Sequence, residues 1–255
     1  MRNFKMILQY EGTRYQGWQK QESTENTIQG KLEALLSKMT GNRVEVQGSG
    51  RTDAGVHALG QVANFHADTQ MKAEEIMDYM NFYLPEDIAV ISLIEVPERF
   101  HSRLNAKGKT YCYRVINSPL PHVFDRRYTH MVEEKLDVEA MRRAADILTG
   151  THDFKAFTSN KRSKKSTVRT IYEIQIEKMT SVSMGSGDRK DEIRFTYSGN
   201  GFLYHMVRII TGTLLEVGTH KRMPEEIAEI LASGQRENAG ELAPAKGLTL
   251  MEVRY

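Results

Sequence analysis

A glycine-rich segment in the first quarter of the chain carries the densest set of residues that could perform chemistry. It runs from Gly48 to Gly60 and holds four glycines with Arg51, Thr52, Asp53 and His57. Glycines allow positive φ and a close approach of the backbone to a ligand. A loop held between two strands can present a carboxylate rigidly, and Arg51 could position or pair with Asp53. The segment therefore makes Asp53 the leading candidate for a catalytic carboxylate.

Familiar catalytic motifs do not fit this segment. Asp53 stands where the dinucleotide fingerprint needs its third glycine, and the GK[ST] of a phosphate-binding loop is missing. No glycine stands two residues before Ser49, so a nucleophile elbow is excluded. Spacing still allows a Ser49–His57–Asp53 triad. A tight hairpin tip, with an aspartate bonded to its own backbone, is the structural alternative.

Length and composition indicate an ordinary globular protein. The chain has 255 residues, of which 40% are hydrophobic and 27% charged, enough for one large domain or two compact halves. No apolar run approaches the roughly 20 residues of a membrane span. Residues 1–10 alternate in polarity and do not form a secretion signal. The sequence therefore predicts a cytoplasmic protein that does not enter a membrane.

The single cysteine limits the redox and metal chemistry. Cys112 has no second cysteine to pair with, which excludes an intramolecular disulfide and every multi-cysteine metal site. It lies in an alternating apolar stretch, so a buried, inert thiol is predicted.

Positive charge is clustered although the formal net charge is only +2. A site for a polyanion must therefore come from local clusters, each of which could also be a solvated loop. The clusters are Lys161, Arg162, Lys164 and Lys165 followed by Arg169; Arg126 with Arg127; and His220, Lys221 and Arg222.

The hydrophobic pattern of the first half predicts the order β-α-β-β-α-β. Alternating residues predict strands at 4–10, 44–46 and 62–65, and an Ile- and Val-rich strand at 88–96. Helical spacing predicts helices over 28–39 and 73–83. The glycine-rich segment connects the second and third of these strands.

The second half repeats this order. Strands are predicted at 110–116, 172–176, 193–197 and 248–255, with helices over 137–148 and 203–214. Asp137 caps the first of these helices, and Pro224 begins a short extra helix. We therefore predict an α+β fold of two ferredoxin-like halves, residues 1–105 and 106–255, joined through a common, mainly antiparallel sheet with a central cleft.

An ordered set of motifs along almost the whole chain resembles the tRNA pseudouridine synthase A family. The resemblance is densest at GRTDAGVHALGQVANF, residues 50–65. The other motifs are YEGTRYQGWQKQ at 10–21, FHSR at 100–103, KTY at 109–111, GTHDF at 150–154, RTI at 169–171, GNGFLYHMVR at 199–208 and APAKGLTL at 243–250. One such motif would be a weak signal, whereas the ordered set is specific.

The resemblance implies roles for individual residues. Asp53 matches the nucleophilic aspartate, and Tyr111 matches the tyrosine that packs against the target base. Arg51 and Arg208 match arginines lining the site, and Arg208 is the implied ion-pair partner of Asp53. His57, His205 and Trp18 keep structural interpretations.

One stretch departs from the family pattern. The family usually has a second glycine in the stretch that reads Val217-Gly218-Thr219-His220 here. Because this stretch lies at a helix end, the difference concerns local loop geometry.

The resemblance implies a reaction, a substrate and an assembly. The reaction isomerises uridine to pseudouridine at positions 38, 39 and 40 of the tRNA anticodon arm, and the enzyme is a homodimer. Because the substrate contains every atom of the product, no cofactor or metal is expected. The basic residues at 161–169 would contact tRNA phosphates and make binding salt-dependent.

Two other functions remain as alternatives. A non-catalytic RNA-binding module is possible because ferredoxin-like folds often recognise RNA, but the chain lacks an RGFGFVxF-like signature. A serine hydrolase built on Ser49 and His57 would instead be acylated by a reactive ester or phosphonate.

Overall fold

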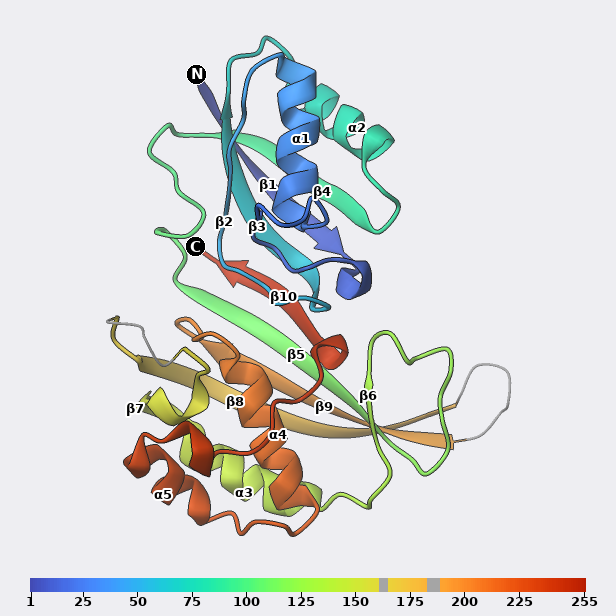
Figure 1. Cartoon of the computed structure of the whole chain (residues 1–255), viewed down its shortest axis with the longest axis vertical. Coiled ribbons are helices and arrows are strands. Elements are labelled where there is room, and N and C mark those ends of the chain that lie inside the picture. Colours follow the sequence, from blue (N-terminus) through green and yellow to red (C-terminus); the bar gives the residue numbers. More distant parts are fainter. Residues whose placement is uncertain (161–164, 183–188) are drawn as a thin grey trace. The chain divides into compact units, whose positions relative to one another are not determined.

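The chain divides into two compact units. The computed structural model describes residues 1–160, 165–182 and 189–255. The first unit comprises Met1–Lys107 and Thr249–Tyr255, and the second comprises Gly108–Leu248 (Figure 1). The sequence pattern predicts residues 248–255 as part of the second half, but nearly all of them group with the first unit. The reason is a parallel pairing in which Thr249 lies opposite His57 and Leu250 opposite Ala58.

The first unit has the ferredoxin-like strand order. Its elements are β1 (Arg2–Tyr10), α1 (Ile28–Thr40), β2 (Val46–Gly48), β3 (His57–Ala67), α2 (Ala73–Tyr83), β4 (Ile88–Val96) and β10 (Leu248–Arg254). Strands β4, β1, β3 and β2 are neighbours in that order, and every pair among them is antiparallel. The sequence prediction of an α+β fold with a mainly antiparallel sheet is therefore confirmed. The common sheet and central cleft between the halves remain a prediction.

Alternation along β1 creates the core of this unit. Phe4, Met6 and Leu8 are fully buried, whereas the residues between them are partly exposed. Both α1 and α2 lie over the sheet of this unit in Figure 1, and the apolar stripe of α1 is buried. A side-chain cap from Thr27 begins α1, and Gly41 ends it with a φ of 71°. These local signals explain why the helix forms where its spacing predicts it.

Strand β3 begins earlier than its sequence pattern suggests. The glycine-rich pattern predicts one loop over residues 48–60, but β3 starts at His57. The connection between β2 and β3 is therefore residues 49–56, which we call the Asp53 loop. The apolar pattern was interrupted by Gly60, whose added Cβ would lie 2.3 Å from the carbonyl oxygen of Met251. A close backbone contact within the sheet thus requires glycine there.

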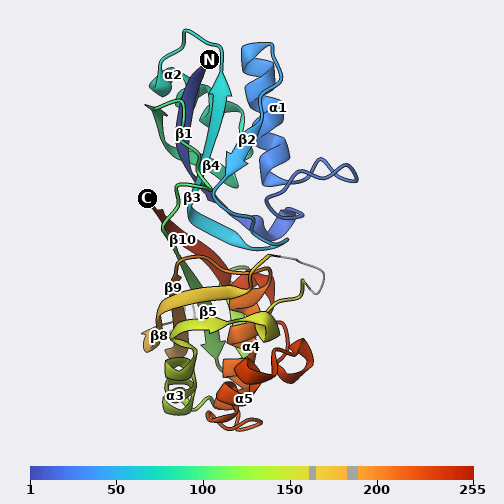
Figure 2. The same ribbon diagram turned by 90° about the vertical axis from the view of Figure 1, so that its left-hand side faces the viewer.

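The second unit also combines an antiparallel sheet with helices. Its main elements are β5 (Gly108–Asn117), β6 (His130–Val132), α3 (Val138–Leu148), β7 (Gly150–Asp153), β8 (Val168–Val182), β9 (Arg189–Gly199), α4 (Met206–Gly218) and α5 (Glu226–Ser233). Strands β5, β9, β8 and β7 are antiparallel neighbours, and β6 pairs in parallel with β5. Figures 1 and 2 both show α3 and α4 side by side against the sheet of this unit. As predicted, Asp137 caps α3, where it accepts a hydrogen bond from the Ala140 amide at 3.0 Å.

The stretch that departs from the family pattern closes the end of α4. His220 adopts a φ of 56°, a conformation that costs a non-glycine residue roughly 1–2 kcal/mol. Its amide donates to the carbonyl of Val217 at 3.0 Å, and the next amide, of Lys221, donates to Glu216 at 2.9 Å. The helix end is therefore closed by backbone hydrogen bonds although a histidine occupies the left-handed position.

A buried carboxylate with two arginine partners joins β5 to β9. Glu192 is 3% exposed. Its Oε1 accepts from Arg114 Nε at 2.7 Å and from Arg194 Nε at 2.6 Å. Burial by itself raises the pKa of Glu192, but the hydrogen bonds and charges of Arg114 and Arg194 outweigh burial and lower it to about 2. The ionised form is therefore the one that the folded protein stabilises.

We predict that this carboxylate makes the stability of the chain depend on acid pH. Because its folded pKa is depressed, Glu192 contributes stability that is present above pH 4.5 and is lost as pH falls toward 2. Glu192→Gln should lower the free energy of unfolding at pH 7 by about 2–3 kcal/mol. The variant should also lose the part of the pH dependence that arises from this group. Urea unfolding at a series of pH values measures both effects. Asp146→Asn, an exposed carboxylate on α3, is the control, and a Glu192→Gln curve parallel to wild type contradicts the prediction.

Two further features bear on the sequence predictions. Cys112 is buried, as predicted, and burial raises the pKa of its thiol. Among the residues described, none of the helices has both the length and the apolar character that crossing a membrane requires.

Candidate active site

The Asp53 loop ends in a tight turn that begins at Asp53 itself. The amide of Val56 donates to the carbonyl of Asp53 at 3.1 Å, and Gly55, the third residue of this turn, has a φ of 79°. A positive φ at the third position is what a type II turn requires, and glycine adopts it without strain. The Asp53 side chain is partly exposed and that of Arg51 is exposed. The turn therefore fixes the backbone of the candidate nucleophile, a residue that remains partly exposed.

Backbone hydrogen bonds join the Asp53 loop to a second segment, residues 15–18. The Trp18 amide donates to the carbonyl of Thr52 at 3.0 Å, and the Gly55 amide donates to the carbonyl of Tyr15 at 3.3 Å. Gly17 lies at the contact with a φ of 89°, and a Cβ added there would stand 2.7 Å from the Thr52 carbonyl oxygen. Residues on both sides of Asp53 are thus tied to the segment 15–18.

A buried polar network supports the loop from inside the unit. The Ser49 hydroxyl donates to Gln61 Oε1 at 2.7 Å, and Gln61 Nε2 donates to the carbonyl of Gly50 at 3.0 Å. The Tyr10 hydroxyl lies 2.8 Å from that of Thr52. Burial raises the pKa of Tyr10 to about 12, so this phenol remains protonated at neutral pH. Hydrogen bonds are strong in the protein interior, where the dielectric constant is low. These hydrogen bonds hold residues 49–52 in a single arrangement.

The serine hydrolase alternative does not agree with this network. A nucleophilic serine passes its proton to a base, but the Ser49 hydroxyl donates to Gln61 and Ser49 is 1% exposed. His57 is buried, and its Nδ1 accepts a hydrogen bond from the Gly12 amide at 3.0 Å. Both side chains therefore act as parts of the scaffold, in agreement with the structural interpretation given to His57. Trp18, only 2% exposed, is likewise a core residue.

Tyr111 lies on β5 in the second unit, on the sheet face that α4 covers. It stands opposite Tyr197 of β9, so the two side chains share a face. The hydroxyl of Tyr197 is 2.8 Å from that of Thr211 on α4. Tyr111 is 8% exposed and meets the ring of Phe202 edge-on, with centroids 5.3 Å apart. Its ring is therefore held in one orientation.

Arg208, on the first turns of α4, lies on the same side of this sheet. Its Nε donates to the carbonyl of Ala243 at 2.8 Å, and the Ala243 amide donates to the carbonyl of Arg208 at 3.2 Å. Burial raises the pKa of Tyr113, and the nearby charge of Arg208 opposes this rise. Tyr113 is two residues from Tyr111 on β5, so the second unit brings the predicted tyrosine and arginine to one face of its sheet.

Comparison with known proteins identifies the family. The sequence matches the family profile described as tRNA pseudouridine synthase over residues 6–105 and 144–255. It is 46% identical over 255 residues to tRNA pseudouridine synthase A of Bacillus sp. (strain KSM-64) and 47% identical over 255 residues to tRNA pseudouridine synthase A 1 of Clostridium tetani (strain Massachusetts / E88). The enzyme named tRNA pseudouridine synthase A of Acetivibrio thermocellus is 46% identical over 256 residues. Each alignment covers 100% of both chains.

The chain belongs to the tRNA pseudouridine synthase family.

Membership of the tRNA pseudouridine synthase family establishes the class of reaction. The family consists of isomerases that convert uridine to pseudouridine, so the resemblance found in the sequence is confirmed. The chain is an enzyme of tRNA modification, which overturns the alternative of a non-catalytic RNA-binding module.

The basic cluster is described only in part. Lys161, Arg162 and Lys164 lie outside the described residues. Lys165 is exposed. Arg169 donates through Nη1 to the carbonyls of Ser166 at 3.0 Å and Val168 at 2.6 Å, and burial lowers its pKa. The guanidinium of Arg169 therefore contacts the backbone at the start of β8 through Nη1.

His205 has an unusual conformation next to the family motif at the start of α4. It is the N-cap residue with a φ of 65°, and its ring stacks on that of Tyr204 with centroids 3.7 Å apart. Its Nδ1 lies 2.9 Å from the hydroxyl of Ser159. The structural interpretation given to His205 is specified by the structure, in which this residue forms the turn into α4.

Several positioning residues were missed in the sequence. Tyr10, Gln61 and Gly17 hold the Asp53 loop, but nothing in their local spacing distinguishes them from ordinary strand and loop residues. The available signal was that Tyr10 and Gly17 fall in one family motif and Gln61 in another. The structure shows that these separate motifs form one polar cluster around residues 49–55.

Proposed function

We propose that this enzyme isomerises uridines 38, 39 and 40 of the tRNA anticodon stem-loop and that Asp53 is its nucleophile. The assignment of Asp53 rests on the backbone hydrogen bonds that join the Asp53 loop to the segment 15–18. A carboxylate that must act on a detached or distorted base needs a fixed backbone, and residues on both sides of Asp53 are tied to the segment 15–18. The position of Asp53 in the family signature motif supports the same role.

The reaction breaks one bond between the uracil and the ribose and forms another between the same two rings. The N1–C1′ bond breaks, the uracil rotates, and a C5–C1′ bond forms, after which C5 loses its proton and N1 carries one. Asp53 would add to C6 of the base or act at C1′ of the ribose, and either route uses the ionised carboxylate as a covalent or charge-stabilising group. The substrate supplies every atom of the product, so the reaction needs no cofactor or metal.

Two residues of the second unit would act on the substrate base and on the charge of the Asp53 carboxylate. The target base must leave its stack at a cost of a few kcal/mol, and stacking on Tyr111 would return about 1–3 kcal/mol. A carboxylate shielded from water is costly without a cation, and we propose Arg208 for that role, with Arg51 as a further substrate contact. Exclusion of water protects the detached uracil from loss.

Binding of tRNA would draw on clustered positive charge. We propose that Lys161, Arg162, Lys164, Lys165 and Arg169 contact phosphates, which makes affinity fall as salt rises. The enzyme is further proposed to act as a homodimer in the cytoplasm, as the resemblance to the tRNA pseudouridine synthase A family implies.

Site-specific tritium release tests the proposed substrate. Three tRNA transcripts would each carry 5-tritiated uridine at only one of positions 38, 39 and 40, and a fourth would carry it only outside the anticodon stem-loop. Because C5 loses its hydrogen when it bonds to C1′, release from the first three and retention in the fourth is expected. Release from the fourth transcript alone would overturn the positions and leave the reaction standing. Retention in all four would overturn the reaction itself.

A further inference from the structure

A backbone segment of the second unit lies lengthwise on the helix that carries Arg208. We call residues 239–244, which lead into the APAKGLTL motif, the strap. Arg208, Gly212 and Glu216 follow one another at intervals of four along α4, so they form one stripe about 12 Å long. Each of the three contacts the strap. The strap therefore connects the middle of α4 to the arginine near its start.

Two glycines let the strap approach this closely. A Cβ added to Gly212 would stand 1.9 Å from the carbonyl oxygen of Glu241. A Cβ added to Gly240 would stand 2.7 Å from the Cα of Thr213. Both contacts are with backbone atoms, which cannot move aside as a flexible side chain could. The helix and the strap are thus packed backbone against backbone.

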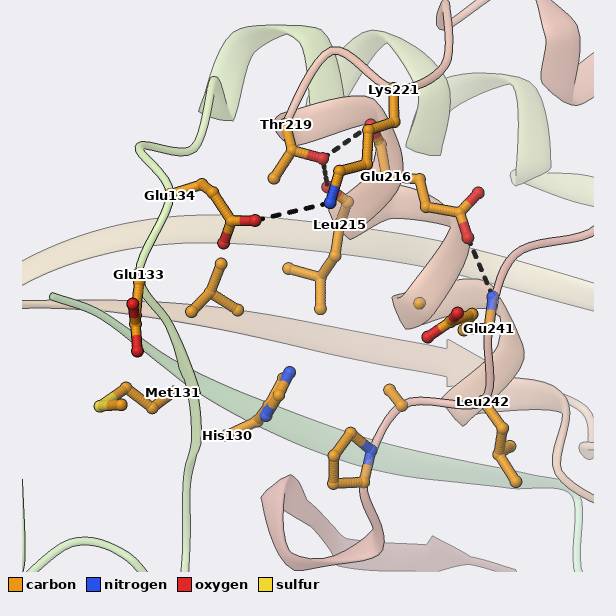
Figure 3. Close-up of a pocket in the computed structure, with 14 residues that line it drawn as sticks. His130, Met131, Glu133, Glu134, Leu215, Glu216, Thr219, Lys221, Glu241 and Leu242 are labelled. Carbon is orange, nitrogen blue, oxygen red and sulfur yellow. Dashed lines mark hydrogen bonds and ion pairs between the residues drawn. The ribbon is translucent and has the colours of Figure 1, made fainter. Parts of the chain in front are cut away.

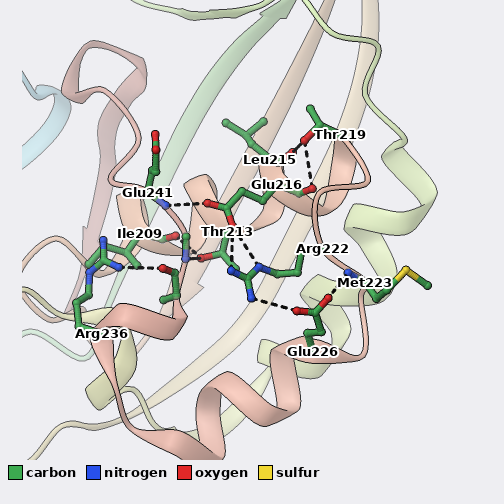
Figure 4. Close-up of polar contacts among 12 residues, drawn as sticks. Ile209, Thr213, Leu215, Glu216, Thr219, Arg222, Met223, Glu226, Arg236 and Glu241 are labelled. Atoms are coloured by element: carbon green, nitrogen blue, oxygen red, sulfur yellow. Dashed lines mark hydrogen bonds and ion pairs between the residues drawn. The ribbon is translucent and has the colours of Figure 1, made fainter.

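Polar side chains of α4 fasten the strap at its first residues. Glu216 Oε1 accepts from the Glu241 amide at 3.0 Å, and Thr213 Oγ1 accepts from the Gly240 amide at 2.9 Å (Figure 4). Without these acceptors the two amides would lack their partners on α4.

Glu216 is itself held by an arginine that lies outside the strap. Its Oε2 accepts from Arg222 Nε at 3.1 Å and from Nη2 at 3.0 Å. Arg222 Nη1 donates onward to Glu226 at 3.4 Å, and Figure 4 shows these three side chains in one chain of contacts. The side chains of Glu216 and Arg222 are 23% and 18% exposed, so solvent screens this pair less than an open surface pair.

Part of the strap borders a pocket. Residues Glu241–Pro244 form part of the wall of a pocket of about 530 Å³, together with β6 and α4 (Figure 3). Figure 3 also shows the contact between the Glu216 side chain and the Glu241 amide. The Tyr113 hydroxyl donates to the Pro244 carbonyl at 2.8 Å, and Arg236 Nη1 donates to the Ala239 carbonyl at 3.1 Å. Both ends of the strap thus have hydrogen bonds outside α4, and the residues between them are held by their contacts with α4.

The other end of the strap holds Arg208. Ala243 accepts from Arg208 Nε and donates from its own amide to the carbonyl of Arg208. A shift of the strap along α4 would move the Ala243 carbonyl and with it the acceptor that orients the guanidinium. We propose that Glu216, held by Arg222, is a positioning residue that keeps the strap in the register that orients Arg208. The consequence for catalysis rests on the function proposed for Arg208.

A spectroscopic experiment tests the positioning directly. In the full-length protein labelled with ¹⁵N, the Nε–H of Arg208 gives an NMR signal that can be assigned with Arg208→Lys. We expect Glu216→Ala to shift this signal and to speed its exchange with solvent by at least about 10-fold, because the bond to Ala243 opens more often. Glu216→Gln, which keeps an oxygen for the Glu241 amide, should have a smaller effect. Glu229→Ala, at an exposed position of α5, is the control. An unchanged signal in Glu216→Ala overturns the proposal.

Kinetic measurements distinguish the positioning role of Glu216 from the catalytic role proposed for Arg208. Glu216→Ala should lower kcat for tritium release by about 10- to 100-fold with KM nearly unchanged, because a misplaced group costs rate rather than binding. In an Arg208→Lys background the same change should cost less than about 3-fold, since the group it positions is gone. An equal loss in both backgrounds overturns the positioning role. If Arg208→Lys alone has the wild-type rate, the function proposed for Arg208 fails while the NMR result still decides the role of Glu216.

Discussion

We expect Asp53→Ala to abolish release of tritium from tRNA that carries 5-tritiated uridine, while the protein stays folded and still binds tRNA. The expected loss is on the order of 10⁴-fold or more, because removal of a nucleophile leaves only binding and environment to accelerate the reaction. Asp53 is partly exposed and its backbone carries the turn to Val56, so removal of the carboxylate should change stability little. Tritium release at saturating tRNA, tRNA binding and thermal unfolding measure the three quantities.

The control and a second variant sharpen this result. Asp68→Ala removes an exposed carboxylate from the same unit and should release tritium at the wild-type rate. Asp53→Asn keeps the shape but not the charge, and it should be as inactive as alanine if a carboxylate performs the reaction. Activity of Asp53→Asn above about a tenth of wild type would show that the role of Asp53 is structural.

Gly17→Ala is expected to cost both stability and rate, although residue 17 has no functional group. The added Cβ would stand 2.7 Å from the Thr52 carbonyl oxygen, and the φ of 89° is strained for alanine. The segment 15–18 must therefore separate from the Asp53 loop. We expect a loss of about 2–4 kcal/mol in the free energy of unfolding and a fall in kcat of about 100-fold, the effect of roughly 1 Å of misplacement.

Gly41→Ala is a matched control for the backbone part of this effect. Gly41 also has a positive φ, of 71°, but an added Cβ there has no atom within 4 Å. It should lose about 1 kcal/mol of stability and keep the wild-type kcat. Equal kcat values for the two variants would show that the bracket between residues 15–18 and the Asp53 loop does not position Asp53.

These predictions share one physical idea, which is that each unit holds a candidate catalytic residue with hydrogen bonds to backbone groups. In the first unit, hydrogen bonds from Trp18 and Gly55 fix the chain on either side of Asp53. In the second, the carbonyl of Ala243 fixes the guanidinium of Arg208. Backbone donors and acceptors are less mobile than long side chains, so they hold a group in one geometry at a small cost in entropy.

The sequence by itself determined much of the local structure. Helix caps at Thr27 and Asp137, the glycine that ends α1, and the alternation of β1 act between neighbouring residues, so their signals are visible without a fold. The glycine-rich loop with Asp53 was recognisable for the same reason, since its turn requires glycine at residue 55. The α+β class follows from the order of such elements.

Only the tertiary structure decided which distant residues support the candidate catalytic groups. Tyr10 meets Thr52, Gly17 meets the Asp53 loop, and Ala243 meets Arg208 across separations of about 35–42 residues. No local period encodes such contacts, because they depend on how strands pair and which backbone lies against which helix. For the same reason β10, which looked like the end of the second half, was found grouped with β3 of the first unit.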